Sequence, residues 1–381
     1  MTILPRKQTG IYGLIRDKSY IAPYVSSIAA VGFGLVALVT AVKHNWISKE
    51  EAYQKADGTL NTFLNNIESK EGFFYHFINR STGAREWNSE ISIIDTGIFI
   101  CGAITVGEFF GKGVQEKADK VYRRINWEWF VDKNKNMFYL GNTPENGFFG
   151  SWDTYGEQLI LYILGSGSPT YHTDKSLYDT MKKPVGEYKN YKRIIYSWFG
   201  SLFTYQFSHA WVDFRNTEDE NGINWFDNSV RATLANRQFC IDNKDTFKTF
   251  DENSWGVSAS VFSDGYNGES GALPASSELK NDGTIPPSGA VSSIVFTPNL
   301  SISALQNYYE NYPGLIGEYG LKSAFNLEQA TPWFSYEYLG VDKGITLAMI
   351  ENYLSESIWQ NFMQNEYVKK GMDDLNISRK M

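Results

Sequence analysis

The sequence predicts an all-α protein built as an α/α barrel, in which buried inner helices are surrounded by outer helices. Three observations support this. Apolar helical segments alternate with amphipathic ones, no strand or βαβ pattern dominates, and no repeat of fixed period indicates a solenoid. A helix that is apolar on every face must be covered on every face, so this alternation favours two concentric layers.

The predicted helices follow this alternation along the chain. They are, in order, 21–42 (apolar), 48–69 (amphipathic), 91–110 (apolar), 114–130 (amphipathic), 157–164 (apolar), 191–213 (aromatic), 228–242 (amphipathic) and a final pair at 300–311 and 342–363. The segment 251–299 is rich in Gly, Ser, Pro and Asn and reads as a long loop. A loop of this length inside a compact domain is usually functional or disordered, and its aromatic residues favour an ordered, functional one.

The first apolar segment, 21–42, is long enough to imitate a membrane span. It contains Pro23 and Tyr24, and it is followed by Ser48 and Glu51, a capping box that opens an ordinary amphipathic helix. A fully buried helix is therefore favoured, and no membrane span is expected. The first 20 residues lack a signal-peptide apolar region. The protein is expected to be cytoplasmic, or exported with its signal already removed.

Composition excludes several function classes. A net charge of −8 and a pI near 5.2 argue against nucleic acid, which requires clustered Lys and Arg. Two cysteines, four histidines and no HExxH motif predict neither a disulfide framework nor a metal site, and no cofactor is expected. Aromatic residues are 16% of the chain, and their rings suit stacking on sugars as well as core packing.

The first candidate acids are Asp153 and Glu157 in SWDTYGEQL, beside Trp152 and Tyr155. A spacing of four would place the two acids on one helix face, although Asp153 could equally be an N-cap. Glu157 lies where the segment becomes apolar. Burial and a neighbouring carboxylate would raise its pKa, as a general acid requires; the alternative is a Glu bonded to a backbone amide.

The second pair is Glu90 and Asp95 in WNSEISIIDTG. A carboxylate within an all-apolar helix costs several kcal/mol unless it is paired, and Asp95 lies inside such a helix. Glu90 lies at the helix start, where the helix dipole favours an acid regardless of function. Together with Glu157 they would supply the carboxyl pair that glycoside cleavage needs.

Two further groups are candidates for binding. Gln206, His209 and Asp213 form a polar stripe on the predicted aromatic helix, which suits either sugar hydroxyls or a buried network between helices. In the long loop, the selected residues are Trp255, Asp264 and Tyr266.

Several long motifs resemble the bacterial family named putative glucoamylase, which includes glycoside hydrolase family 144 endo-β-1,2-glucanases and relatives. These motifs are EGFFYHFINRSTGAREWNSEISIIDTG, GSWDTYGEQLILYILGSGSPT, YSWFGSLFTYQFSHAWVDFR, SWGVSASVFSDGYNG and YLGVDKGITLAMIENY. The resemblance covers residues 20–375. It implies an (α/α)6 barrel with long loops at the cleft end, forming one domain over 21–381 after an extension at 1–20.

The resemblance also implies roles for individual residues. Glu157 matches the proposed general acid, Glu90 and Asp95 match acids facing the cleft, and Asp342 is a third candidate base. Trp87 and Trp211, which lie within the matching motifs, join the substrate-binding candidates. The expected function is hydrolysis of a β-glucan, an oligo- or polysaccharide that is most simply β-1,2-linked, with inversion of configuration. The alternatives are a retaining transglycosylase, an exo-acting glucosidase or a glycan-binding protein without activity; no oligomeric state is predicted.

Overall fold

The computed structural model describes residues 11–379, whose contacts form two compact units. The first unit contains residues 11–153, Gln158–Met181 and Ser355–Ser378. The second contains Thr154–Glu157, Lys182–Leu354 and Arg379. Each unit is described by itself.

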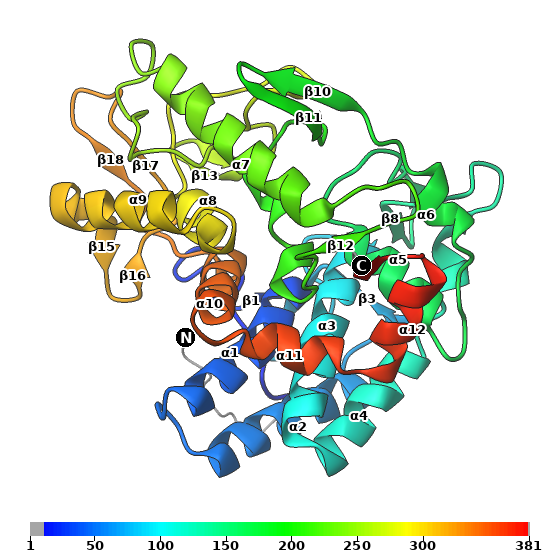
Figure 1. Cartoon of the computed structure of the whole chain (residues 1–381). Helices are drawn as coiled ribbons and strands as arrows, with labels where there is room; N and C mark the ends of the chain where they lie inside the picture. Colours follow the sequence, from blue (N-terminus) through cyan, green and yellow to red (C-terminus); the bar gives the residue numbers. More distant parts are fainter. Residues whose placement is uncertain (1–10, 380–381) are drawn as a thin grey trace. The chain divides into compact units, whose positions relative to one another are not determined.

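The first unit is mainly helical (Figure 1). Its helices are α1 (Ile28–Lys43), α2 (Lys49–Asn65), α3 (Ile93–Phe110), α4 (Lys112–Arg123), α5 (Leu159–Gly167), α6 (Ser176–Thr180), α11 (Ser357–Met363) and α12 (Glu366–Asp374), with a 3-10 turn at Trp127–Phe130. Nearly all of α1, α3 and α5 is buried, whereas α2 and α4 bury one face each. The predicted alternation of buried and amphipathic helices is confirmed in this unit.

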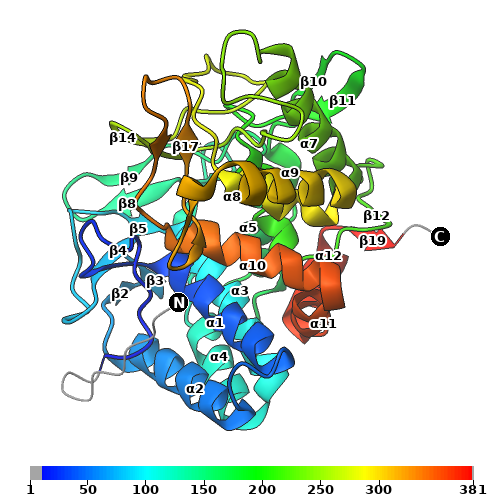
Figure 2. The ribbon, with the colours of Figure 1, turned by 90° about the vertical axis from the view of Figure 1, so that its left-hand side faces the viewer.

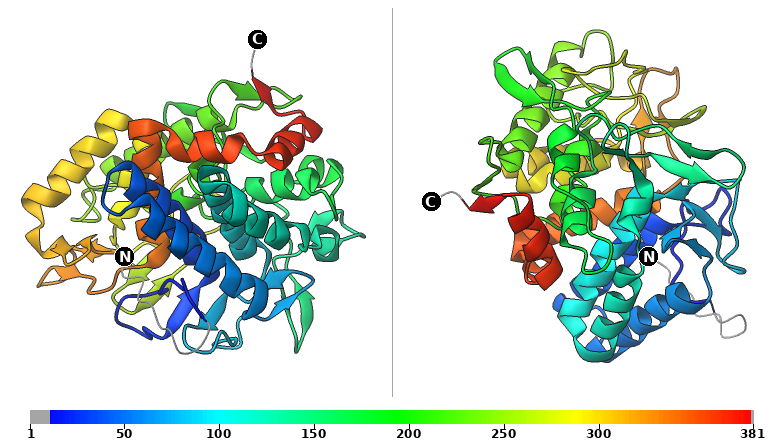
Figure 3. Two further views of the ribbon diagram at one scale, coloured as in Figure 1. Left: turned by 90° about the horizontal axis from the view of Figure 1, so that it is seen from below. Right: turned by 90° about the vertical axis from the view of Figure 1, so that its right-hand side faces the viewer.

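The most buried helix, α3, packs against α1, α4, α5 and α11. Figures 1 and 3 show the blue α2 and the cyan α4 side by side in the same unit. The amphipathic α2 begins at the predicted cap, where the Ser48 side chain accepts a hydrogen bond from the Glu51 amide at 3.0 Å. Such a cap satisfies an amide that the helix itself leaves unpaired.

Two glycines let α1 and α3 approach closely. A Cβ atom on Gly32 would lie 2.4 Å from the Ile98 carbonyl oxygen, and one on Gly102 would lie 2.2 Å from the Gly32 carbonyl oxygen. These are backbone atoms of the facing helix, so no side-chain rotation can make room. The contact between the two buried helices therefore depends on glycine at both positions.

Short strands connect the helices of the first unit. They are β1 (Val25–Ser27), β2 (Ser69–Lys70), β3 (Phe73–Phe74), β4 (Phe77–Asn79), β5 (Ile91–Ser92), β6 (Val131–Asp132), β7 (Met137–Phe138), β8 (Gly141–Thr143) and β9 (Gly147–Phe149). They pair antiparallel as β1–β4, β2–β3, β6–β7 and β5–β8–β9. β5 runs directly into α3, so this small sheet fixes where the buried helix begins.

The second unit combines four helices with several hairpins. The helices are α7 (Trp225–Asp242), α8 (Pro287–Val291), α9 (Pro298–Asn311) and α10 (Gly340–Ser355). The strands are β10 (Val185–Tyr188), β11 (Tyr191–Ile195), β12 (Thr217–Glu218), β13 (Ser260–Phe262), β14 (Gly265–Asn267), β15 (Ile316–Gly317), β16 (Gly320–Leu321), β17 (Phe325–Asn326) and β18 (Trp333–Phe334), and β19 (Ser378–Arg379) ends the described chain. Figure 2 shows the green β10–β11 hairpin next to α7, against which β11 packs.

Three helix predictions need correction. The aromatic segment 191–213 is not a helix: it contains β11 and two 3-10 turns, Leu202–Tyr205 and Ser208–Ala210. The final helix, 342–363, is broken where Glu356 adopts a left-handed conformation (φ 57°) between α10 and α11. The helix predicted over 114–130 ends at Arg123. The helical character of the chain is confirmed, with small antiparallel sheets added to it.

The apolar run 21–42 contributes to α1, most of whose residues are buried. Within residues 11–379, α3 alone has the length and composition of a membrane-crossing helix, and 78% of its apolar stretch is buried in the protein. Residues 1–10 of the predicted extension lie outside the described residues, whereas Ile11, Leu14 and Ile15 are buried. The predicted single domain over 21–381 stays a prediction.

We expect Gly102→Ala to lower the free energy of unfolding by about 1–3 kcal/mol, the usual cost of overpacking a core. The added methyl group would force α1 and α3 apart. The matched control is Gly107→Ala in the same helix, whose Cβ would lie 3.1 Å from the nearest atom, the Ala118 Cβ. Urea denaturation of both variants measures the difference. If Gly102→Ala lowers the free energy of unfolding no more than Gly107→Ala does, the contact between α1 and α3 adapts easily to the added methyl group.

Candidate active site

The candidate acids of the first unit meet at the N-terminus of α3. Ser92 is the N-cap of this helix: its hydroxyl oxygen accepts a hydrogen bond from the Asp95 amide at 3.1 Å and donates one to Asp95 Oδ2 at 2.6 Å. A carboxylate in the first helical turn is also favoured by the helix dipole. Asp95 is only 6% exposed, so these local contacts partly offset the cost of its burial.

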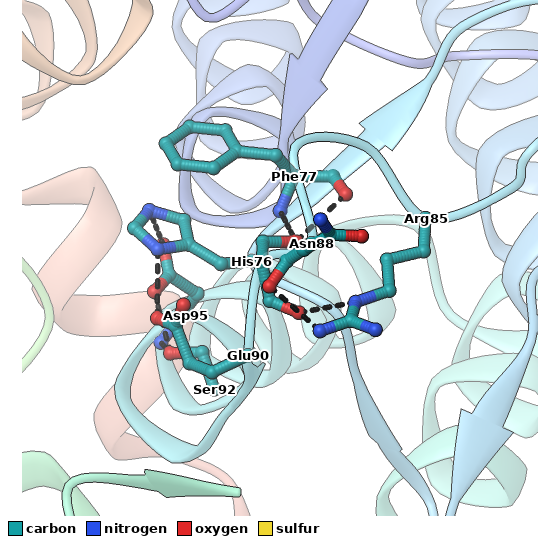
Figure 4. A network of polar contacts seen from close by, with 8 residues as sticks. His76, Phe77, Arg85, Asn88, Glu90, Ser92 and Asp95 are labelled. Carbon is teal, nitrogen blue, oxygen red and sulfur yellow. Dashed lines mark hydrogen bonds and ion pairs between the residues drawn. The ribbon is translucent and has the colours of Figure 1, made fainter. Parts of the chain in front are cut away.

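His76 joins the two acids (Figure 4). Its Nδ1 lies 2.9 Å from Glu90 Oε1, and its Nε2 lies 3.5 Å from Asp95 Oδ1. The chain holds the imidazole between them, because the His76 amide donates to the Glu90 carbonyl at 2.8 Å and the Ile28 amide donates to the His76 carbonyl at 3.1 Å. The structure places Glu90 and Asp95 at the two nitrogens of one histidine, which was not among the candidates.

The three groups change one another's ionisation. Burial acts to lower the pKa of His76, but the charge of Asp95 and the bond to Glu90 outweigh it and raise that pKa to about 9. Burial acts to raise the pKa of Glu90, and the His76 hydrogen bond and charge more than reverse this, so it is lowered. Burial raises the pKa of Asp95, against the opposing effects of His76 and Ser92. At neutral pH the cluster is thus an imidazolium between two acids.

The same three residues are also a possible metal ligand set, since one atom from each lies within 4.8 Å of the others. An imidazole binds a metal only through an unprotonated nitrogen. Each ring nitrogen of His76 already faces a carboxylate oxygen, Nδ1 at 2.9 Å from Glu90 and Nε2 at 3.5 Å from Asp95. The donor set therefore fits an ion-paired cluster better than a metal centre.

A tight turn leads into this cluster from the preceding strand. Trp87 and Asn88 are both left-handed (φ 55° and 52°), which is unusual for a bulky side chain. Arg85 holds this turn, since its guanidinium donates to the carbonyls of Ser89 and Asn88 at 2.6 Å each and pairs with Glu145 at 2.6 and 3.0 Å. Trp87 remains 49% exposed, so its ring is available to a ligand.

Glu157, in the second unit, lies in a turn and not on a helix. α5 begins only at Leu159 with Gln158 as its N-cap, so Asp153 is neither the cap nor a helical neighbour of Glu157. The Ser208 hydroxyl donates to the Glu157 carbonyl at 2.6 Å and fixes the turn. Asp153 and Glu157 are both half-buried.

The aromatic neighbours of these acids are buried. Trp152 is 5% exposed, and Tyr155 is 1% exposed and stacks on Trp225 with ring centres 4.8 Å apart. Burial raises the pKa of Tyr155 well above its usual value. Trp211 has no exposed surface. Their predicted contact with sugar gains no support from this packing.

The polar stripe predicted at Gln206, His209 and Asp213 is divided among separate partners. The Gln206 amide group donates to the Gly289 carbonyl at 2.7 Å, and His209 Nε2 lies 2.9 Å from the Ser229 hydroxyl. Both residues are 1% exposed, and burial lowers the pKa of His209 to about 3, so that its ring is neutral. Of the two alternatives, Gln206 and His209 fit the buried network.

Asp213 and Asp342 are more accessible. Asp213 is half-buried and pairs with Arg215, with its two oxygens 2.8 and 2.9 Å from the guanidinium nitrogens. Asp342 lies in the first turn of α10 beside a cavity of about 260 Å³ that Ser288, Tyr319 and Lys343 also line. Burial lowers the pKa of Lys343 to about 8, opposed by the charge of Asp342.

The long segment 251–299 is ordered around the β13–β14 hairpin and α8. Asp264 and Tyr266 are exposed on this hairpin, beside a depression of about 740 Å³. Trp255 differs, because its side chain has no exposed surface and its amide and carbonyl both bond to the Tyr308 hydroxyl, at 3.2 and 2.9 Å. The geometry gives Trp255 a core position and leaves Asp264 and Tyr266 open to a ligand.

Residues 150–366 match the sequence profile of the family described as putative glucoamylase (Glycoamylase). The chain belongs to this family. It is 26% identical over 385 aligned positions to an exo-β-1,2-glucooligosaccharide sophorohydrolase (non-reducing end) of Parabacteroides distasonis. That match covers 91% of this chain and 52% of the relative, so the chain spans about half the length of that relative.

Two solved structures of similar fold extend the comparison. A putative glucoamylase from Bacteroides uniformis is 27% identical, with a TM-score of 0.87 and coverage of 98% of this chain and 93% of that one. An endo-β-1,2-glucanase from Chitinophaga pinensis, solved with sophorotriose and glucose, is 24% identical, with a TM-score of 0.86 and coverage of 97% and 94%. The chain thus shares the fold of the putative glucoamylase family over nearly its whole length.

We expect Trp255→Ala to destabilise the protein by about 3–5 kcal/mol, the cost of removing a large buried ring. The exposed Trp46→Ala is the matched control, since 64% of that side chain is accessible. Urea denaturation distinguishes the two. A loss below about 1 kcal/mol for Trp255→Ala would show that its ring is not part of the core and would return it to the substrate-binding candidates.

Proposed function

We propose that this protein is a glycoside hydrolase that cleaves β-1,2-linked glucan or its oligosaccharides. The observation that carries the proposal is the pair of acids at the start of α3, bridged by His76, because glycoside cleavage needs an ionised carboxylate, as base or nucleophile, in addition to the carboxyl that donates the proton. The similarity to the sophorohydrolase of Parabacteroides distasonis supports the linkage. The (α/α)6 barrel is part of this proposal, supported by the buried and amphipathic helices of the first unit.

We propose the following roles for the side chains. Glu157 is the proton donor, and Asp95 or Glu90 is the base, with Asp342 the further candidate. The resemblance and the half-buried position of Glu157 support its assignment. Trp87, Asp264 and Tyr266 are the substrate-binding candidates whose exposure supports that role.

Product analysis tests the function. Purified protein is incubated with linear β-1,2-glucan, α-1,4-glucan and laminarin, and the products are separated by length. Fragments of mixed length from β-1,2-glucan would indicate the endo action expected from the sequence, whereas disaccharide alone would indicate exo action. Release from starch only would contradict the linkage, and no release from any glycan would favour a binding protein.

We expect Glu157→Gln to reduce kcat on β-1,2-glucan by about 10²–10⁴, the usual contribution of general acid catalysis. Stability should be unchanged, because Ser208 bonds to the Glu157 backbone and the amide keeps the shape of the side chain. An aryl glycoside with a good leaving group needs less protonation and should be less affected. The control is Glu187→Gln, an exposed acid on β10. Near-normal turnover of glucan by Glu157→Gln would make Glu157 a structural residue.

Stereochemistry is a separate expectation. We expect inversion, in which the base directs water to the face opposite the leaving group and a β-glucan first yields the α-anomer. Proton NMR of the reducing-end signal during the first minutes of hydrolysis measures this before mutarotation. An initial β-anomer would show retention and would make Glu90 or Asp95 the nucleophile.

A further inference from the structure

His76 is held in place by contacts at one face of its ring and at both ring nitrogens, although the side chain remains 30% exposed. Its face stacks on Phe77 with ring centres 3.8 Å apart and planes 15° from parallel, and Phe77 in turn contacts the edge of Trp87 at 5.1 Å. Its two nitrogens face Glu90 and Asp95. The backbone of His76 is bonded to Ile28, the first residue of α1, and to Glu90 in the turn before β5. The ring therefore cannot turn away from the two acids without disrupting several contacts.

The charged groups around this ring are predominantly acidic. Glu90 contacts it from the turn before β5 and Asp95 from α3, and Asp17, before β1, adds a third negative charge that acts on it. The positive charge of Arg85 acts on Glu90 but is itself paired with Glu145. With His76 protonated and both contacting acids ionised, the three side chains carry a net charge of −1.

Of the two acids, Asp95 depends more on the positive charge of His76 to remain ionised. It is the most buried member of the cluster, and both burial and the charge of Glu90 oppose its ionisation. Opposing them are the charge of His76, the Ser92 hydroxyl and a backbone hydrogen bond from Ala29. Of these stabilising contacts, only His76 carries a full charge. A carboxylate can accept a proton from water or attack a sugar only when it is ionised.

We propose that His76 is a positioning residue, whose imidazolium keeps the carboxylates of Glu90 and Asp95 ionised and fixed for the glycoside hydrolysis proposed above. This role rests on the proposed function, but it does not depend on which of the two acids is the base. It is distinct from that of a metal ligand, because the imidazolium itself supplies the positive charge. His76 holds its charge through hydrogen bonds to residues far from it in sequence.

The first test is the pH dependence of kcat/KM on β-1,2-glucooligosaccharides. In His76→Gln the side chain can still donate a hydrogen bond but has no charge, so the pKa of Asp95 should rise. We expect the acidic limb of the profile to move up by about 1–3 pH units, the usual effect of removing an opposite charge at this distance. Activity near pH 6 should fall about tenfold or more and partly return at higher pH.

Two further variants separate charge from shape. His76→Lys restores a cation, and its acidic limb should lie closer to that of the wild type than the limb of His76→Gln does. His172→Gln is the matched control, because His172 is exposed on a loop of the same unit. An unchanged acidic limb in His76→Gln, with the wild type active, would overturn the proposal. Equal limbs in the Lys and Gln variants would also overturn it, because the charge would then have no effect.

Histidine NMR and unfolding measurements report on the cluster without relying on activity. The Cε1 proton of His76 should titrate near pH 9, as its raised pKa requires. A raised pKa in the folded protein stabilises it fully below the unfolded value of about 6.5 and loses this effect as pH rises through the folded value. The stability advantage of the wild type over His76→Gln should therefore be greatest below about pH 6.5 and shrink towards pH 9. A His76 titration near 6.5 would overturn the proposal.

The same measurements distinguish the other outcomes. If the wild type cleaves no glycan, the proposed function fails and the catalytic role of His76 fails with it, while the NMR titration still shows whether the cluster is charged. If Zn²⁺ or Ca²⁺ alone stabilises the wild type but not His76→Gln, the three residues bind a cation and the imidazolium role is overturned. No effect of either ion supports the ion-paired cluster.

Discussion

The burial of α3 on every side is the constraint on which the first unit depends. This helix is surrounded by α1, α4, α5 and α11, yet Asp95 lies in its first turn. A buried carboxylate without partners would cost several kcal/mol, and removing one member of a buried ion pair leaves its partner uncompensated. The β5 strand, the Ser92 cap and the loop that carries His76 must therefore be placed together. The geometry of the candidate site follows from the requirements of packing this helix.

Much of the helical architecture could be predicted from the sequence because a 3.6-residue period reports directly on which faces are covered. The alternation of buried and amphipathic segments identified α1 to α5 and α7. The segment 191–213 was misread because its dense aromatic residues suggest a buried helix. Its backbone is instead held by side-chain hydroxyls: the Phe203 amide donates to the Ser258 hydroxyl, and the Thr204 hydroxyl donates to the Ser201 carbonyl. The hydrophobic period of a sequence does not reveal an irregular backbone whose polar groups are hydrogen-bonded by side chains.

The candidate acids could be predicted because each is a charged residue in an apolar context. Their partners could not. His76 is 14 residues from Glu90 and 19 from Asp95 in sequence, and no spacing rule joins them. Their contact arises because the His76 amide pairs with the Glu90 carbonyl beside the short strands. Aromatic residues are harder to assign: Trp and Tyr rings bury large areas, so abundance alone does not separate an exposed ring such as Trp87 from a core residue such as Trp255.

His209 and His76 show why residue type alone does not assign a role. His209 is enclosed by Phe214, Phe226 and Phe296, and burial lowers its pKa to about 3. His76 is also packed on a phenylalanine, but two carboxylates at its nitrogens raise its pKa to about 9. Desolvation acts in the same direction on both rings, so the neighbouring charges decide the outcome.

Because one ring is neutral and the other is charged, the two histidines can affect neighbouring residues in different ways. A neutral His209 bonds to the Ser229 hydroxyl, but it cannot alter the ionisation of an acid by its own charge. A charged His76 acts on both acids at once, through position and through electrostatics. In the first unit, His76 therefore acts directly on the ionisation of the candidate catalytic acids. The packing that buries α3 also creates the charge balance that its acids need.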